Sequence, residues 1–189
     1  MPYLCAALNG LAAIALATVL APGATNAPAE VNEAYVRANI ETWRAGWLLW
    51  TAAAVSLIAF FAWWTRHVKR SALVWLALAI ACAGLAFDVV AESLLAWWSP
   101  EHYLETAPLA FRLTGIGANG LYSVAGLILT ARTRGLPAWL ARWSWTVWLL
   151  GIGLAGAVAT GSDVAARLLT AALFALLVPW LVIFGRRLA

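Results

Sequence analysis

Six long apolar stretches limit what this chain can fold into more than any other feature of its sequence. A helix needs about 20 mainly apolar residues to cross the ~30 Å hydrocarbon core of a membrane. The stretches run over Tyr3–Pro22, Trp43–Trp64, Leu73–Trp98, Leu109–Ala131, Trp139–Thr160 and Val164–Gly185. They lack the two-residue alternation of a membrane barrel, so their backbone polar groups must be satisfied inside helices. The sequence predicts one all-α domain, residues 1–189, built as a polytopic bundle of six transmembrane helices.

Composition makes membrane lipid the first predicted partner of this bundle. The hydrophobic set supplies 65% of the 189 residues and charged residues only 11%, against about a quarter charged in soluble domains. A soluble fold of this length cannot bury so much apolar surface. The formal net charge is +4, but the basic residues lie in short loops, which argues against a nucleic-acid partner.

Loop charges predict the orientation of the bundle. Alternate loops and the end of the chain carry Arg66, Lys69, Arg70, Arg132, Arg134, Arg186 and Arg187. The opposite loops carry Glu30, Glu33, Glu41, Glu101, Glu105 and Asp163. Because cytoplasmic loops are enriched in Lys and Arg, both termini are predicted to be cytoplasmic. Lys69 is the only lysine; with the many alanines, this indicates a GC-rich bacterial genome and hence a bacterial inner membrane.

Tryptophan is abundant, with 13 residues. An interfacial aromatic belt is predicted for those at the ends of the apolar stretches, namely Trp43, Trp63, Trp64, Trp97, Trp98, Trp139 and Trp143. Four others lie deeper and either stack on a lipid, pigment or flat ligand or fill space: Trp50, Trp75, Trp148 and Trp180.

The first apolar stretch has a second interpretation as a signal peptide. Thr25-Asn26-Ala27 follows it and matches a small-residue cleavage pattern. A cleaved signal peptide normally starts with a basic region, which is absent here. We therefore expect a retained helix, whereas cleavage would leave five spans.

A polar segment, Ala27–Thr42, separates the first two stretches. Within it Glu33, Arg37 and Glu41 recur every four residues, which places them on one helix face. This pattern predicts an amphipathic helix on the outer surface that runs into the second span. Its charged stripe is either a solvated face or a docking site.

Two glycine motifs of the form GxGxxG occur in the second half of the chain. They comprise Gly115, Gly117 and Gly120, and then Gly151, Gly153 and Gly156. Both lie inside apolar helices with no preceding strand, so the dinucleotide-binding interpretation fails. Small residues let membrane helices approach closely, which predicts tight packing between the helices of 109–131 and 139–160.

The third stretch contains two acids, Asp88 and Glu92, four residues apart and hence on one helix face. Acids in a membrane span are costly, so the pair is predicted to face the bundle interior. Arg112 enters the fourth stretch at a similar depth. Two interpretations remain open: an acid serves as a proton or cation site that Arg112 tunes, or Arg112 neutralises an acid and locks two helices together.

Asn119 forms a second polar position in the middle of the fourth stretch, with Tyr122 and Ser123 one turn later. A lone Asn in a membrane helix commonly bonds to a neighbouring helix. Asn119 is therefore either an interhelical hydrogen-bonding group or part of a polar ligand site.

Enzymatic chemistry is not expected. His67 and His102 lie in loops predicted on opposite sides of the membrane, which argues against a two-His haem or a His-rich metal site. Cys5 and Cys82 lie far apart in apolar stretches and suit core packing. No catalytic residue, metal site or cofactor is predicted.

Several short motifs carry a family resemblance: Gly120-Leu121-Tyr122, the loop from Arg132 to Pro137 with Trp139-Leu140, and Ala38-Asn39-Ile40 before Trp43. With the layout of nearly the whole chain, they resemble a broad group of small bacterial six-helix membrane proteins catalogued as a domain of unknown function. The resemblance implies six spans and assigns no binding or catalytic residue.

Two functions fit these observations. One is a small carrier or sensor with an intramembrane acidic site, for which the candidate binding residues are Asp88, Glu92, Arg112 and Asn119. The alternative is a non-catalytic accessory or structural subunit of a larger membrane complex, whose partners would be other subunits or further copies of the chain.

Overall fold

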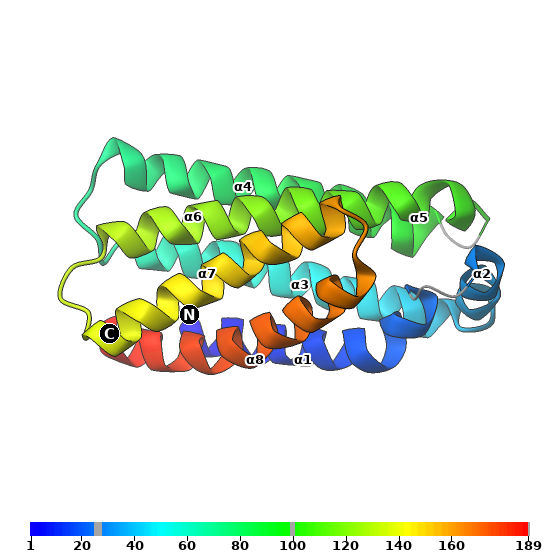
Figure 1. Ribbon diagram of the computed structural model, residues 1–189, viewed down its shortest axis with the longest axis horizontal. Helices are drawn as coiled ribbons and strands as arrows, with labels where there is room; N and C mark the ends of the chain where they lie inside the picture. Colours follow the sequence, from blue (N-terminus) through cyan, green and yellow to red (C-terminus); the bar gives the residue numbers. More distant parts are fainter. Residues whose placement is uncertain (25–27, 99–100, 189) are drawn as a thin grey trace.

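The computed structural model describes residues 1–24, 28–98 and 101–188, and these ranges form helices joined by short turns, without strands. Figure 1 shows one elongated bundle in which the long helices lie side by side. The elements are α1 (Pro2–Ala15), η1 (Leu16–Leu20), η2 (Ala21–Gly23), α2 (Ala29–Ala38), α3 (Ile40–Thr65), α4 (Ala72–Ser93), η3 (Leu94–Trp98), α5 (Tyr103–Arg112), η4 (Leu113–Ala118), α6 (Asn119–Arg132), α7 (Ala138–Ala159) and α8 (Asp163–Leu188). The predicted all-α fold is confirmed.

Five helical stretches of the described residues are long and apolar enough to cross a membrane: Pro2–Gly23, Ile40–Thr65, Ala72–Trp98, Tyr103–Arg132 and Asp163–Leu188. They match five of the six predicted spans. The sixth, α7, has 22 residues and lies between α6 and α8. Its first half carries the polar residues Arg142, Ser144 and Thr146.

The first predicted stretch is helical over its whole length and is packed into the bundle. The backbone of Gly185 in α8 lies against Pro2 of α1, and Asn9 of α1 reaches Ser56 of α3 at 3.5 Å. The cleavage pattern Thr25-Asn26-Ala27 lies outside the described residues.

The two ends of the bundle differ in charge. Because Pro2 lies against Gly185, both termini are at one end, where Figure 1 also shows the α3–α4 and α6–α7 connections. We call this the basic end, since it carries Arg66, Lys69, Arg70, Arg132, Arg134, Arg186 and Arg187. The other, the acidic end, is formed by α2 and α5, and the α7–α8 turn points toward it.

The polar segment before α3 is not the single helix that the charge spacing predicted. Asn39 has non-helical φ and ψ of −125° and 30°, so α2 and α3 are separate helices. Glu33 and Arg37 form an ion pair at 2.6 Å within α2, whereas Glu41 belongs to α3 and pairs with Arg44 at 3.4 Å. The break lets α2 turn over the acidic end, where Val36 is fully buried.

Aromatic side chains fill the core near the basic end. Trp148 and Trp180 meet edge to face with ring centroids 5.3 Å apart. The cluster, which we call the aromatic core, comprises Phe60, Phe61, Trp64, Trp148, Trp180 and Phe184. Two deep tryptophans therefore fill space, one of the interpretations left open by the sequence.

Two tryptophans assigned to the interfacial belt are instead fully buried, so that part of the prediction is wrong. Trp43 donates its indole N–H to the Leu95 carbonyl at 2.8 Å, and Trp64 donates to Thr133 Oγ1 at 2.9 Å. Each indole finds a partner inside the protein and does not need a wet interface. Trp97 and Trp98 do lie exposed, on η3.

The glycine-rich helices pack closely, as their sequences predicted. An added Cβ on Gly126 of α6 would lie 2.2 Å from the Trp148 ring, and one on Gly151 of α7 would lie 2.0 Å from Ser123 Oγ. Both GxGxxG motifs lie in helical segments. The close approach of α6 and α7 therefore depends on glycine at these positions.

Candidate functional site

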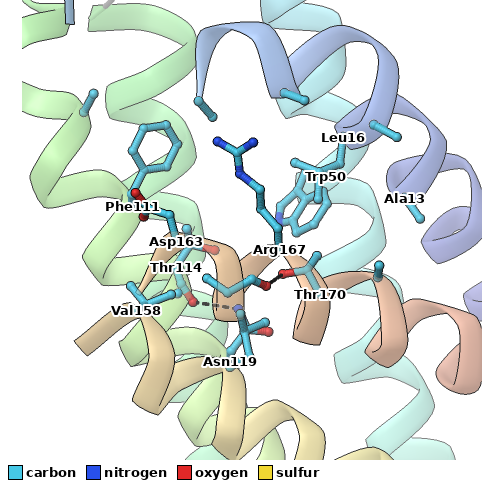
Figure 2. Close-up of a pocket in the computed structure, with 18 of the residues that line it drawn as sticks. Ala13, Leu16, Trp50, Phe111, Thr114, Asn119, Val158, Asp163, Arg167 and Thr170 are labelled. Atoms are coloured by element: carbon cyan, nitrogen blue, oxygen red, sulfur yellow. Dashed lines mark hydrogen bonds between the residues drawn. The ribbon is translucent and has the colours of Figure 1, made fainter. Parts of the chain in front are cut away.

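A cavity of about 1240 Å³ lies in the half of the bundle nearer the acidic end. Its walls come from α1 to α2, α3, α5 to the start of α6, the end of α7 and the start of α8. Figure 2 shows these walls around an open centre. Much of the lining is alanine from α1, η1 and α8, including Ala13, Ala17, Ala166, Ala171 and Ala175. Small side chains on facing helices leave the space between them open.

The cavity exists because neighbouring helices have unequal lengths. The continuous helix Tyr103–Arg132 has 30 residues, whereas α7 has 22. Figure 1 shows the α7–α8 turn ending well short of α2 and α5. Gly161 makes this turn with φ of +70°, a conformation that glycine adopts without strain. Beyond the turn, α1 continues as η1 and η2, while α3 and α5 extend beside α2 and η3.

One arginine projects into the cavity. Figure 2 shows the Arg167 side chain extending from α8 into the open space. Asp163 also lines the cavity, one turn earlier on α8. Arg167 forms neither of the two ion pairs found among the described residues, which are Arg37–Glu33 and Arg44–Glu41. Its guanidinium group is therefore available to a ligand.

A second, inner chamber of about 50 Å³ adjoins the cavity deeper in the bundle. Four residues line both spaces: Trp50, Thr114, Asn119 and Phe174. Polar residues from three helical stretches complete the chamber, namely Asn9, Asp88, Tyr122 and Ser123. The inner chamber thus extends the cavity inward and carries these polar groups on a wall that is otherwise mainly apolar.

Asp88 occupies the wall of this chamber and is only 3% exposed. Thr114 Oγ1 donates to Oδ1 at 2.5 Å, and Tyr122 OH donates to Oδ2 at 2.9 Å. Gly84, one turn earlier on α4, lets the Tyr122 ring come close, since a Cβ there would lie 2.8 Å from it. Both carboxylate oxygens therefore accept a hydroxyl hydrogen bond.

Glu92 lies one turn nearer the acidic end and is also 3% exposed, but it does not line either space. Its Oε2 contacts the hydroxyl of Thr51 on α3. The other oxygen, Oε1, is buried without a hydrogen-bond partner among the described residues. Glu92 is thus buried between α3 and α4, beside the chamber.

Arg112 does not join the two acids. Its side chain is exposed on α5, and no ion pair links it to Asp88 or Glu92 within the described residues. The interpretation in which Arg112 neutralises an acid and locks two helices is therefore wrong. Similar depth along the bundle brought these residues together in the prediction, but depth does not determine the direction in which a side chain points.

A π-helical segment sets the position of the other chamber residues. In η4 the Asn119 N–H bonds to the Thr114 carbonyl, and the Asn119 side chain donates to the same oxygen at 3.1 Å. This wider turn places Thr114 and Asn119 together on the wall shared by both spaces. Such segments are often found at functional sites.

Sequence reasoning identified Asp88 and Asn119 but missed Asn9, Thr51 and Thr114. A charged residue in an apolar stretch stands out. Thr and Asn are harder to assign, because they often bond to their own helix backbone, as Thr51 does to the Trp47 carbonyl at 3.0 Å.

Comparisons with protein-family models, with curated proteins and with solved structures found no match, so the candidate site rests on the geometry of this chain alone.

Proposed function

We propose that this chain is a six-span protein of a bacterial inner membrane, with α7 as the sixth span and both termini in the cytoplasm. Large apolar side chains on the outer surface support lipid contact, for example Trp75 at 58% exposure and Leu149 at 55%. The position of α7 between α6 and α8 supports its inclusion. The basic end carries both termini, which agrees with the positive-inside rule.

Within this arrangement, we propose that the protein is a small carrier or sensor that binds an amphiphilic organic solute from the outer side. The cavity of about 1240 Å³ at the acidic end carries this proposal. It is large enough for a small organic molecule, since ligand sites commonly range over about 300–1,000 Å³. Its lining is mainly apolar, with few polar groups to orient a ligand.

Asp163 and Arg167 are the charged residues among the described lining of the cavity, and the arginine indicates the chemistry of the solute. Arg167 presents a guanidinium group that forms no ion pair with the described residues. Guanidinium groups bind carboxylates and phosphates through paired hydrogen bonds. The expected ligand therefore has an apolar body, placed against the alanines of α1 and α8, and one anionic group.

Binding can be tested with medium-chain monocarboxylates on the purified protein in lipid nanodiscs. We expect a saturable rise in melting temperature that is lost in Arg167→Gln and in Ala171→Trp, which fills the cavity from α8. Arg187→Gln, at the basic end, and Ala79→Trp, on the exposed face of α4, are matched controls that should bind as the wild type does.

Two outcomes would contradict the proposal. One is equal stabilisation of the wild type and of Ala171→Trp, since the ligand would then bind elsewhere. The other is no stabilisation by any carboxylate in the series. If binding occurs, uptake of the same carboxylate into proteoliposomes separates a carrier from a sensor, because only a carrier moves the solute.

A further inference from the structure

We propose that the inner chamber is a binding site for one monovalent cation, with Asp88 as its only charged ligand. Na⁺ is the ion chosen for the test. The inference deepens the proposed function by naming an ion that would bind together with the solute. It rests on the proposed function in one respect, that the cavity opens to the outer side.

The first argument is the uncompensated charge of Asp88. A carboxylate that is 3% exposed inside an apolar bundle is costly unless a positive charge lies beside it. Thr114 and Tyr122 supply hydrogen bonds but no charge. No ion pair of Asp88 occurs among the described residues. A bound cation would supply the missing charge.

The second argument is the set of oxygen atoms around the chamber. Asn9 donates its amide nitrogen to the Cys5 carbonyl at 2.9 Å, and Asn119 donates its own to the Thr114 carbonyl at 3.1 Å. Each amide therefore retains its oxygen as an acceptor. Ser123, held against Gly151, adds a hydroxyl. Hard cations bind carboxylate, amide and hydroxyl oxygens.

Charge and size favour a monovalent ion. Among the described residues, Asp88 is the one acid that lines the chamber. Glu92 contacts Thr51 on α3 and lines neither space. Within the described residues, no three His, Cys, Asp or Glu side chains gather as they would around a metal. A volume of about 50 Å³ accommodates one ion with roughly one water molecule.

Ion binding would reach the solute cavity through the shared wall. The proposed ligands come from α1 (Asn9), α4 (Asp88) and α6 (Asn119 and Ser123). An ion that holds them together fixes the distance between these helices. Asn119 also lines the outer cavity, so the ion and the solute would contact opposite sides of the same residue.

The test measures binding of ²²Na⁺ to the protein in nanodiscs, without any organic solute, with choline chloride to hold the ionic strength constant. We expect saturable binding of one ion per chain. Asp88→Asn should abolish it, and Asn119→Ala should weaken it at least about tenfold, as the loss of a group that supports an ion site typically does. The matched control is Glu105→Gln, an exposed acid on α5 at the same end, which should leave binding unchanged.

Two results would overturn the inference: no saturable ²²Na⁺ binding by the wild type, or binding that Asp88→Asn and Asn119→Ala both leave intact. If Asp88→Asn does not fold, ²²Na⁺ binding by Asn119→Ala and Ser123→Ala decides the question in its place. Failure here with carboxylate binding intact overturns the ion site alone. Conversely, ion binding without carboxylate binding overturns the proposed solute and leaves the ion site.

Discussion

The two acids of α4 have different hydrogen-bonding surroundings although they are one turn apart and equally buried. Asp88 accepts from two hydroxyl groups, an arrangement that suits an ionised carboxylate. Within the part of the chain that the structure describes, the Glu92 carboxyl group has one hydrogen-bond partner, Thr51, whose single hydroxyl hydrogen can be donated to the Trp47 carbonyl. Oε1 of Glu92 accepts no hydrogen bond there. These surroundings suit a neutral acid that donates to Thr51.

Amide substitutions should therefore have unequal effects on stability. In Na⁺ buffer the proposed ion balances the Asp88 charge, and Asn at position 88 loses that ion and turns an NH₂ group toward the hydroxyl of Thr114 or Tyr122. We therefore expect Asp88→Asn to lower the free energy of unfolding in this buffer by about 1–3 kcal/mol. Gln at position 92 can donate to Thr51 as the neutral acid does, so Glu92→Gln should change it by less than about 1 kcal/mol. Thermal denaturation in nanodiscs measures both, and the reverse order would refute the assignment.

At the scale of single residues, the sequence predicts that the two acids of α4 are buried but does not predict which residues they contact. Asp88 and Glu92 were expected inside because lipid exposure of an acid is costly, and both are buried. Arg112 was grouped with them by depth, yet it is exposed. Arg112 is the last residue of α5, just before η4, and its depth along the span does not determine the direction of its side chain.

At the scale of helices, the contact between α6 and α7 depends on individual glycines. Gly151 faces Ser123, whereas nothing lies within 4 Å of a Cβ built on Gly156 of the same helix. Glycine is a poor helix former wherever close approach does not require it. Substitutions at Gly151 report the packing role of glycine, whereas substitutions at Gly156 report its low helix propensity.

Replacing each of these two glycines with alanine should change the free energy of unfolding in opposite directions. Gly151→Ala places a methyl group 2.0 Å from Ser123 Oγ, and we expect a loss of about 1–3 kcal/mol. Gly156→Ala should gain up to about 1 kcal/mol. Ser123→Ala should recover most of the loss, a coupling that a double-mutant cycle on melting curves would measure. Additive effects of Gly151→Ala and Ser123→Ala would show that they do not clash.

Helix positions were predictable because span length and apolarity set them, and five of the six stretches recur as long apolar helices. The break between α2 and α3 was not predicted, because the four-residue charge spacing continues across Asn39. Burial of Val36 against the acidic end, rather than charge spacing, explains why α2 turns back. Only tertiary packing carries that information.

At the scale of the whole molecule, the bundle is closed at one end and hollow toward the other. The aromatic core seals the half near the basic end, where Trp180 donates to Ser144 Oγ at 2.9 Å and Trp64 to Thr133. The cavity occupies the opposite half, where α7 and α8 turn back early. If the basic end is cytoplasmic, water-soluble reagents should reach the cavity from outside only.

Cysteine labelling tests this asymmetry in right-side-out membrane vesicles. In a Cys82→Ala background, where Cys5 is fully buried, Ala171→Cys should react with a membrane-impermeant maleimide added outside, because Ala171 lines the cavity. Ala138→Cys, exposed at the start of α7 near the basic end, should react only after the vesicles are permeabilised. The reverse pattern would invert the orientation. Protection of Ala171→Cys on both sides would show that the cavity is closed to water, and a hollow that water cannot enter could not take an anionic solute from outside.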